Sequence, residues 1–273
     1  MSDPVPAIAE ASATGAVAEI FADIRRVLGV EVVNLIWRHL ATIPDALPWA
    51  WGMLRPLYAD GTIAAEAQAL HDRLSLPQLP CDVLATIDLG SNELASIRNI
   101  LAAYDRTNAM ALVALSALLC RLKEQPATDE PLAGMGLGSL SLSPTAGIPL
   151  PPLPSLDALP EPVANLVVTL NRFGTRRDNP VLASMYRHLA YWPGYLALSW
   201  ALIAPLDADG FLERAIGDAL AKAQAQGGRL ATRLWAPQLD AATEDAIRAA
   251  VELFAGDVIA KMVVICALLR ANT

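Results

Sequence analysis

Polar side chains set among aromatic rings recur in two similar segments of the chain, IWRHLATIPDALPWAW (36–51) and MYRHLAYWPGYLALSW (185–200). Asn34, Trp37 and Arg38 fall at helical spacing and therefore share one face of an expected helix. Tyr186 and Arg187 occupy the corresponding places in the second segment. A few polar groups on an apolar, aromatic face are typical of a site that binds a small molecule. The tryptophans would keep any pocket there small.

Two of the three histidines, His39 and His188, also correspond to each other in these segments. A histidine kept in both copies favours a shared structural role, such as a hydrogen bond across a helix contact, and a catalytic role is the alternative. Neither histidine belongs to an HxxxH or HExxH pattern or has a carboxylate beside it. We therefore expect no metal site and no cofactor.

The two segments match at a constant displacement of 149 residues, which predicts a duplicated unit. Pro44, Leu47 and Trp51 recur as Pro193, Leu196 and Trp200, and the turn Ala59-Asp60-Gly61 recurs as Ala208-Asp209-Gly210. Two copies in one chain commonly pack as a homodimer would, about a twofold axis. We predict an all-α protein of two homologous helical repeats, 14–124 and 160–273, that form a single-chain pseudo-dimer with a cleft at the seam.

Apolar residues recur at steps of three and four almost throughout, and strand patterns are scarce. We expect helices at 16–28, 32–42, 47–57, 64–74, 92–103 and 107–122, and then at 162–173, 179–191, 211–225, 245–254 and 258–270. The segment 125–159 is rich in proline and glycine, which a packed helix does not tolerate, and is predicted to be a linker.

Composition narrows the classes of function. The chain is 54 % hydrophobic and 18 % charged, with a formal net charge of −8. An acidic chain with no basic cluster argues against nucleic acid. The apolar runs fall short of the roughly 20 residues that span a membrane, and the N-terminus lacks a secretory pattern. The three cysteines, in no CxxC pair, fit a reducing compartment. We expect a soluble, cytoplasmic protein without a membrane partner.

The phrases LATIPDALPWAW, YDRTNAMALVALSALL and LAYWPGYL resemble the group I 2-haloacid dehalogenases, and the likeness extends over most of the chain. The resemblance implies an all-helical, two-repeat hydrolase for short 2-halocarboxylic acids. In that family a water molecule displaces halide directly, without metal, cofactor or covalent intermediate. The resemblance also implies that an Asp of the second repeat and an Asn of the first activate this water, in an apolar pocket between the repeats.

Carried onto this sequence, the family's Asn corresponds to Asn108, with Thr107 in place of a glycine. The alternative is that Asn108 only occupies the first turn of its helix, where short polar residues are common. The family's Asp corresponds to Met185, which cannot accept a proton, although Ser184 and Tyr186 on either side keep the pattern.

Asp178 is the nearest acid before Met185 and is the remaining candidate for the base. It could serve if its helix begins later than expected or if the preceding loop folds back. The alternative is that Asp178 marks the start of a helix at Asn179-Pro180, because proline favours the first helical turn.

The resulting hypothesis is a 2-haloacid dehalogenase-like hydrolase with Asn108 and Asp178 as catalytic candidates. Asn34, Trp37, Ser184, Met185 and Tyr186 are the candidates for substrate binding. The alternative is a pseudoenzyme of the same fold that binds a small acid or a partner without turnover. The expected partner is a small halogenated carboxylic acid or a similar ligand, and a homodimer is a further expectation.

Overall fold

The computed structural model describes residues 5–78, 84, 87–123, 150–175, 177–235 and 238–273, and within these ranges every regular element is a helix. The first half of the chain has a 3-10 turn and five helices: η1 (Glu10–Ser12), α1 (Gly15–Leu28), α2 (Leu35–Leu40), α3 (Ala46–Ala59), α4 (Thr62–His71) and α5 (Ser91–Leu122). The second half has η3 (Leu156–Ala158), α6 (Glu161–Arg172), α7 (Ser184–Leu189), α8 (Pro193–Ala208), α9 (Phe211–Ala231), α10 (Ala241–Leu253) and α11 (Ala260–Ala271). The prediction of an all-α fold is confirmed.

The order of elements recurs in the two halves. A 3-10 turn precedes both α1 and α6. The next three helices of the first half, α2, α3 and α4, correspond in order to α7, α8 and α9 of the second half. The long helix α5 corresponds in position to α10 and α11, which a π-helical turn (Phe254–Ile259) joins into one continuous rod. The twofold relation of the halves and the boundaries 14–124 and 160–273 stay predictions, and most of the predicted linker 125–159 lies outside the described residues.

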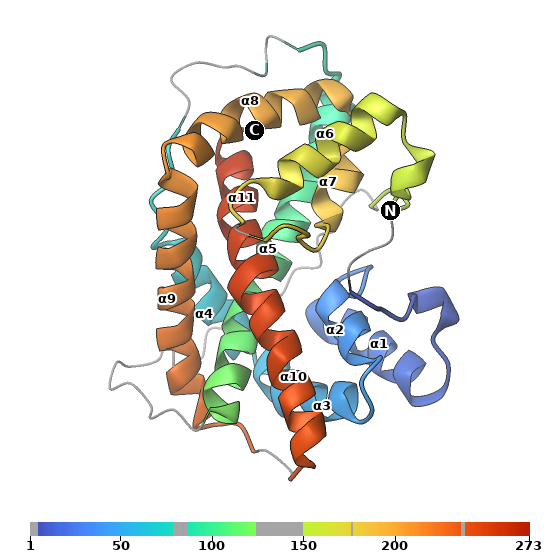
Figure 1. Ribbon diagram of the computed structural model, residues 1–273, viewed down its shortest axis with the longest axis vertical. Helices are drawn as coiled ribbons and strands as arrows, with labels where there is room; N and C mark the ends of the chain where they lie inside the picture. The colour runs from blue at the N-terminus through green and yellow to red at the C-terminus, as the bar shows by residue number, and fades with distance from the viewer. Residues whose placement is uncertain (1–4, 79–83, 85–86, 124–149, 176, 236–237) are drawn as a thin grey trace.

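The helices α5 and α11 form the centre of the molecule, and α9 flanks them along one side (Figure 1). The helix α5 lies beside α9 and α11 and contacts both. Its stretch from Ala109 to Leu118 is buried throughout, and so is α11 from Ala260 to Leu269. These stretches are apolar around nearly their whole circumference, as expected for helices enclosed on all sides.

Small residues let α5 and α9 approach closely. A Cβ atom added to Gly227 of α9 would lie 2.5 Å from the carbonyl carbon of Ser116 and 2.6 Å from the backbone nitrogen of Ala117. Nearby, Gln226 donates a hydrogen bond of 2.9 Å to the carbonyl of Glu66, and Arg229 approaches the Glu66 carboxylate at 3.3 Å. The first and second halves are therefore joined by direct backbone packing and by buried polar contacts.

Several of the expected helix boundaries are wrong, and α8 was not among the expected helices. The helix expected at 211–225 continues to Ala231, and the one expected at 32–42 is confined to Leu35–Leu40. The segments 92–103 and 107–122 form the single helix α5, since nothing between them breaks a helix. The helix expected at 179–191 begins only at Ser184. The side chain of Asn171 accounts for this delay, because it donates to the Val181 carbonyl (3.1 Å) and accepts from the Ala183 nitrogen (3.0 Å). It thereby satisfies backbone groups that a helix would otherwise pair.

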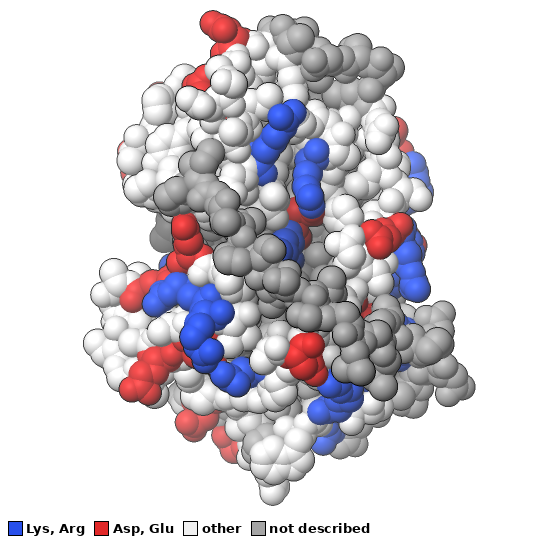
Figure 2. Space-filling view, turned by 180° about the vertical axis from the view of Figure 1, so that it is seen from behind, with Lys and Arg blue, Asp and Glu red and all other residues white. Residues whose placement is uncertain are grey.

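On the face in Figure 2, Lys and Arg lie interspersed with Asp and Glu. Within the described residues, no helix combines the length and the apolar character needed to cross a bilayer.

The tight contact at Gly227 predicts a stability difference between two glycines of the same helix. Gly227→Ala should destabilise the protein by about 1–3 kcal/mol or more, because the new methyl group meets backbone that cannot move aside. Gly217→Ala, at an exposed position with open space around it, should instead stabilise by about 0.4–1 kcal/mol. Urea unfolding of the two variants measures both, and equal effects would contradict the packing described here.

Candidate functional site

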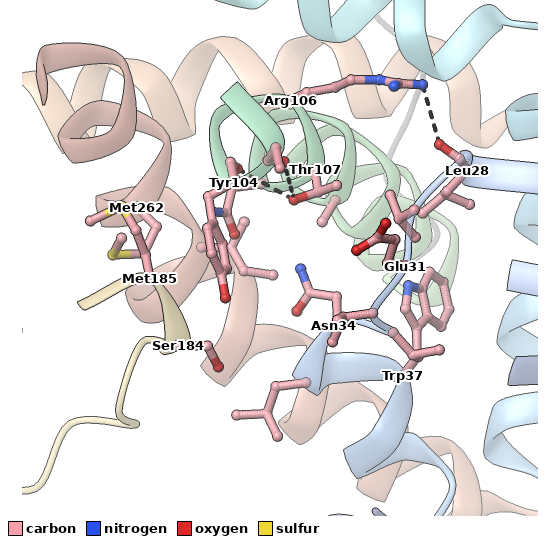
Figure 3. Close-up of a pocket in the computed structure, with 18 of the residues that line it drawn as sticks. Leu28, Glu31, Asn34, Trp37, Tyr104, Arg106, Thr107, Ser184, Met185 and Met262 are labelled. Carbon is pink, nitrogen blue, oxygen red and sulfur yellow. Dashed lines mark hydrogen bonds between the residues drawn. The ribbon is translucent and has the colours of Figure 1, made fainter. Parts of the chain in front are cut away.

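A cavity of about 570 Å³ lies where the two halves of the chain meet (Figure 3). One wall comes from the end of α1, the segment 29–34, α2 and one face of α5. The opposite wall comes from residues 182–185 and from the π-helical turn with the start of α11, and Leu150 and Leu153 complete it. Most of the lining side chains are apolar. The cavity is larger than the small pocket that the tryptophans led us to expect.

Asn34 and Trp37 both line this cavity. Asn34 immediately precedes α2, but its side chain makes no capping hydrogen bond with that helix. Figure 3 shows its amide directed toward the middle of the cavity. Trp37 is held behind it by edge contacts with Trp51 and Tyr58, at ring-centroid distances of 5.5 and 6.4 Å. The result is a polar group presented from a rigid aromatic base.

The wall formed by α5 carries Tyr104, Thr107, Asn108 and Ala111, which share one face of the helix. The Tyr104 hydroxyl lies 2.8 Å from Nδ1 of His188 on α7, so this hydrogen bond fixes the ring. Asn108 is in the middle of α5 and 6 % exposed. The interpretation of Asn108 as a first-turn residue is therefore wrong, and its burial on the cavity wall calls for another explanation.

The position that corresponds to the family's Asp carries a thioether. Met185 lines the cavity, and the Cys266 thiol donates to its sulfur at 3.3 Å. The Asn108 amide in turn donates to the Cys266 sulfur at 3.7 Å. Burial raises the pKa of Cys266 well above its usual value. This thiol is therefore protonated at neutral pH and supplies neither a base nor a thiolate nucleophile.

The charged residues of the wall include four arginines and one carboxylate, Glu31. Arg25 and Arg26 pair with Glu10 and Asp23, and Arg38 donates to the Ile8 carbonyl at 3.0 Å. The fourth arginine, Arg106, is half-buried and has no carboxylate partner among the described residues.

Arg106 donates one hydrogen bond of 3.2 Å, to the Leu28 carbonyl (Figure 3). Burial lowers its pKa, and no nearby acid opposes that effect. Glu31 is exposed and accepts a hydrogen bond from the Leu150 nitrogen at 3.0 Å. Neither Arg106 nor Glu31 was foreseen from the sequence, although Arg106 stands only two residues before Asn108.

Two of the predicted site residues lie outside this wall. Asp178 is exposed in the segment before α7 and does not line the cavity. It does not cap a helix at Asn179 either, because no helix begins there. Tyr186 is fully buried behind the wall rather than in it, and its hydroxyl has no hydrogen-bond partner among the described residues. Ser184, by contrast, lines the cavity at the start of α7.

The duplicated histidines make structural contacts. Nδ1 of His39 lies 2.7 Å from the Pro6 carbonyl oxygen, and His188 bonds Tyr104 as described. In the described part of the chain, no three His, Cys, Asp or Glu residues are grouped closely enough to hold a metal ion.

The environment of His188 predicts a pH dependence. Burial lowers its pKa below the usual 6.5, so the folded protein keeps the ring neutral while the unfolded chain takes up a proton below that pH. Its contribution to stability is complete above pH 6.5 and is lost as the pH falls toward the lower pKa of the folded state. The gap in unfolding free energy between wild type and His188→Gln should therefore narrow from pH 7.5 to 5.5. A gap that widens on acidification would contradict this assignment.

No family model matches the sequence, and no curated protein is significantly similar to it. Solved structures do match over nearly the whole chain. A D-2-haloacid dehalogenase in complex with L-LA has a TM-score of 0.71 and 18% identity, covering 99% of this chain and 96% of that one. A mutant of a D-2-haloacid dehalogenase with D-2-CPA has a TM-score of 0.66 and 18% identity, covering 99% and 95%. A further D-2-haloacid dehalogenase mutant has a TM-score of 0.71 and 19% identity, covering 99% and 94%. This chain therefore has the fold of the D-2-haloacid dehalogenases, as the resemblance in its sequence predicted.

Proposed function

We propose that this protein is a 2-haloacid dehalogenase-like hydrolase that binds 2-halocarboxylic acids in the cavity between its halves and turns them over slowly. The observation that carries the proposal is the arrangement around Asn108. A buried amide faces an apolar cavity of the dehalogenase fold, and a methionine occupies the position where the resemblance places the base. These groups can bind the acid and orient a water molecule, but Met185 cannot remove a proton from that water.

The charges of the wall support an acid as ligand. Arg38 and Arg106 are the two arginines of the wall that no described carboxylate neutralises, and for Arg106 partial burial lowers the pKa and makes the charge costly. A bound carboxylate would relieve the cost through charge-assisted hydrogen bonds, which Arg forms in a bidentate geometry. We assign Arg106 as the anchor of the substrate carboxylate.

The amides support a bound water as nucleophile. Asn34 and Asn108 present side chains that donate and accept hydrogen bonds, and can hold a water molecule without taking up its proton. General-base assistance typically contributes 10²–10⁴-fold to a rate. A chain with Met185 in the base position forgoes this factor unless another carboxylate replaces it, and Glu31 is the carboxylate that lines the described wall.

A second candidate function is binding of a small acid without hydrolysis. The pair Cys266 and Met185 favours it, because a neutral thiol and a thioether in contact with each other cannot take a proton from a bound water. In that case the cavity would serve for uptake or sensing of the acid.

Met185→Asp tests the proposal most sharply. A carboxylate at this position should raise halide release from 2-bromopropionate by about 10²–10⁴-fold over wild type. The gain should appear as the pH rises, because apolar surroundings raise the pKa of the new carboxyl and only its ionised form accepts a proton. Halide is measured for each enantiomer separately, and Met185→Asn serves as a control of similar polarity without a base.

The same assay separates the remaining assignments. Asn108→Ala in the Met185→Asp background should abolish the gain. If wild type already releases halide and Glu31→Gln stops it, Glu31 is the base, and if Asp178→Asn stops it, the loop before α7 moves to the site. Absence of turnover in wild type and in folded Met185→Asp would refute the hydrolase and favour the binding protein.

Arg106→Met predicts a loss of affinity rather than of folding. Hydrogen bonds to charged groups contribute about 1.5–3 kcal/mol, so the dissociation constant of 2-bromopropionate should rise by about 10- to 150-fold. Arg121→Met, near the end of the same helix and outside the cavity, should leave the constant unchanged. Calorimetric titration of both variants measures this, and unchanged binding by Arg106→Met would show that the carboxylate is held elsewhere.

A further inference from the structure

We propose that the preferred ligand is a carboxylic acid with an alkyl chain of about 8–12 carbons, whose tail fills the part of the cavity that a two- or three-carbon acid leaves empty. The assignment of the carboxylate end rests on the function proposed above. The assignment of the tail rests on the volume of the cavity, on its lining and on the side at which it opens.

Volume is the first argument. A water molecule, with one non-hydrogen atom, takes up about 30 Å³ in the liquid. On that scale a cavity of about 570 Å³ has room for roughly 19 such atoms. A 2-halopropionate has only six non-hydrogen atoms and would fill about a third of the space, whereas a 2-halodecanoate has 13.

The lining is the second argument. Besides polar side chains and the rings of Tyr58 and Phe254, the wall carries many aliphatic side chains from both halves of the chain, among them Val27, Val30, Leu35, Leu182, Val258 and Ile259. Water beside such surfaces finds few hydrogen-bond partners, so an alkyl group that displaces it gains affinity. A short acid would leave water in contact with these aliphatic side chains.

The opening is the third argument. Val32 is a large apolar residue that remains 42% exposed at the edge of the cavity, next to the exposed Glu31. The exposed edge also carries the charged Arg26 and Glu31, and Val32 gives an alkyl chain an apolar contact at this edge that continues into the aliphatic wall. The deeper wall carries the buried Asn108 and Met185.

The rim is held in place by hydrogen bonds, so the tail channel exists before a ligand arrives. Glu31 accepts from the Leu150 nitrogen at 3.0 Å, and Arg187 donates to the Pro154 carbonyl at 2.7 Å. Tyr191 donates to the Pro152 carbonyl at 2.8 Å. These contacts fix the segment 150–154, which presents Leu150 and Leu153 to the cavity. Pre-formed sites avoid the ordering cost that weakens binding.

A chain-length series tests the inference without relying on turnover. The full-length protein is titrated calorimetrically with straight-chain carboxylates from propionate to decanoate, below their micelle concentrations. Affinity should rise by roughly fourfold for each added methylene at least as far as octanoate, as expected for apolar burial. Decylammonium, with the same tail and the opposite charge, should bind far more weakly because it cannot pair with Arg106.

A matched pair of variants locates the tail. Leu153→Trp replaces an aliphatic side chain of the channel with a bulky indole ring. It should weaken the binding of decanoate at least tenfold and leave the binding of propionate unchanged. Leu156→Trp, two residues after the segment 150–154 and outside the cavity wall, should change the affinity for neither decanoate nor propionate. A flat chain-length series, equal binding of decylammonium, or equal effects of the two tryptophans would overturn the tail channel.

Failure of the hydrolase proposal gives a different pattern. If Met185→Asp releases no halide while the chain-length series and the Leu153→Trp effect appear as expected, the tail channel stands and the hydrolase falls. If Met185→Asp hydrolyses 2-bromopropionate and affinity does not grow with chain length, the hydrolase stands and the tail channel falls.

Discussion

The helices α5 and α9 pack backbone against backbone at Gly227. Gly227 lies so close to the backbone of Ser116 and Ala117 that no side chain fits between the helices. Because α5 belongs to the first half of the chain and α9 to the second, this contact fixes the two halves against each other. The buried contact between Arg229 of the second half and Glu66 of the first half joins the same two parts of the chain. A cavity whose walls come from both halves keeps its shape only while this packing holds.

The length of α5 then determines what the cavity can do. A continuous helix from Ser91 to Leu122 carries Arg106 and Asn108 past the point where the halves meet, and α11 runs alongside. The guanidinium that we propose as the anchor and the amide that we propose to orient the water thus lie on one rigid element, which favours precise placement. The opposite wall supplies Met185 and, behind it, Cys266. In the proposed site, the residue in the base position and the carboxylate anchor therefore lie on different walls, so one can be changed without the other.

Much of the fold could be predicted from the sequence because apolar residues recur at the regular spacing of a helix. Apolar spacing predicted most of the helices but not α8, and the order of helices recurs in the two halves, in keeping with the constant displacement between the two RHL segments. Boundaries failed where a single side chain decided them. The hydrogen bonds of Asn171 to Val181 and Ala183 delay the start of α7, and no local pattern around Asp178 reveals a partner ten residues upstream.

The candidate site was predictable in part, for a similar reason. Asn34, Trp37, Asn108, Ser184 and Met185 line one cavity, and each had been singled out by repeat or by resemblance. Arg106 and Glu31 were missed because their importance comes from the absence or presence of partners in space, which spacing along the chain does not record. Tyr186 was misplaced because the side-chain direction changes by about 100° for each residue of a helix, so neighbours on a short helix such as α7 face different ways.

The proposed function places a carboxylic acid between the two halves of the chain, against Met185. Protein labelled with ¹³C in its methionine methyl groups tests this directly, since Met185 and Met262 line the cavity while Met53 and Met110 are buried elsewhere. Titration with octanoate should shift the Met185 and Met262 signals in parallel with calorimetric saturation and leave Met53 and Met110 in place. Saturation without movement of Met185 and Met262, or with larger shifts at Met53 and Met110, would contradict the account.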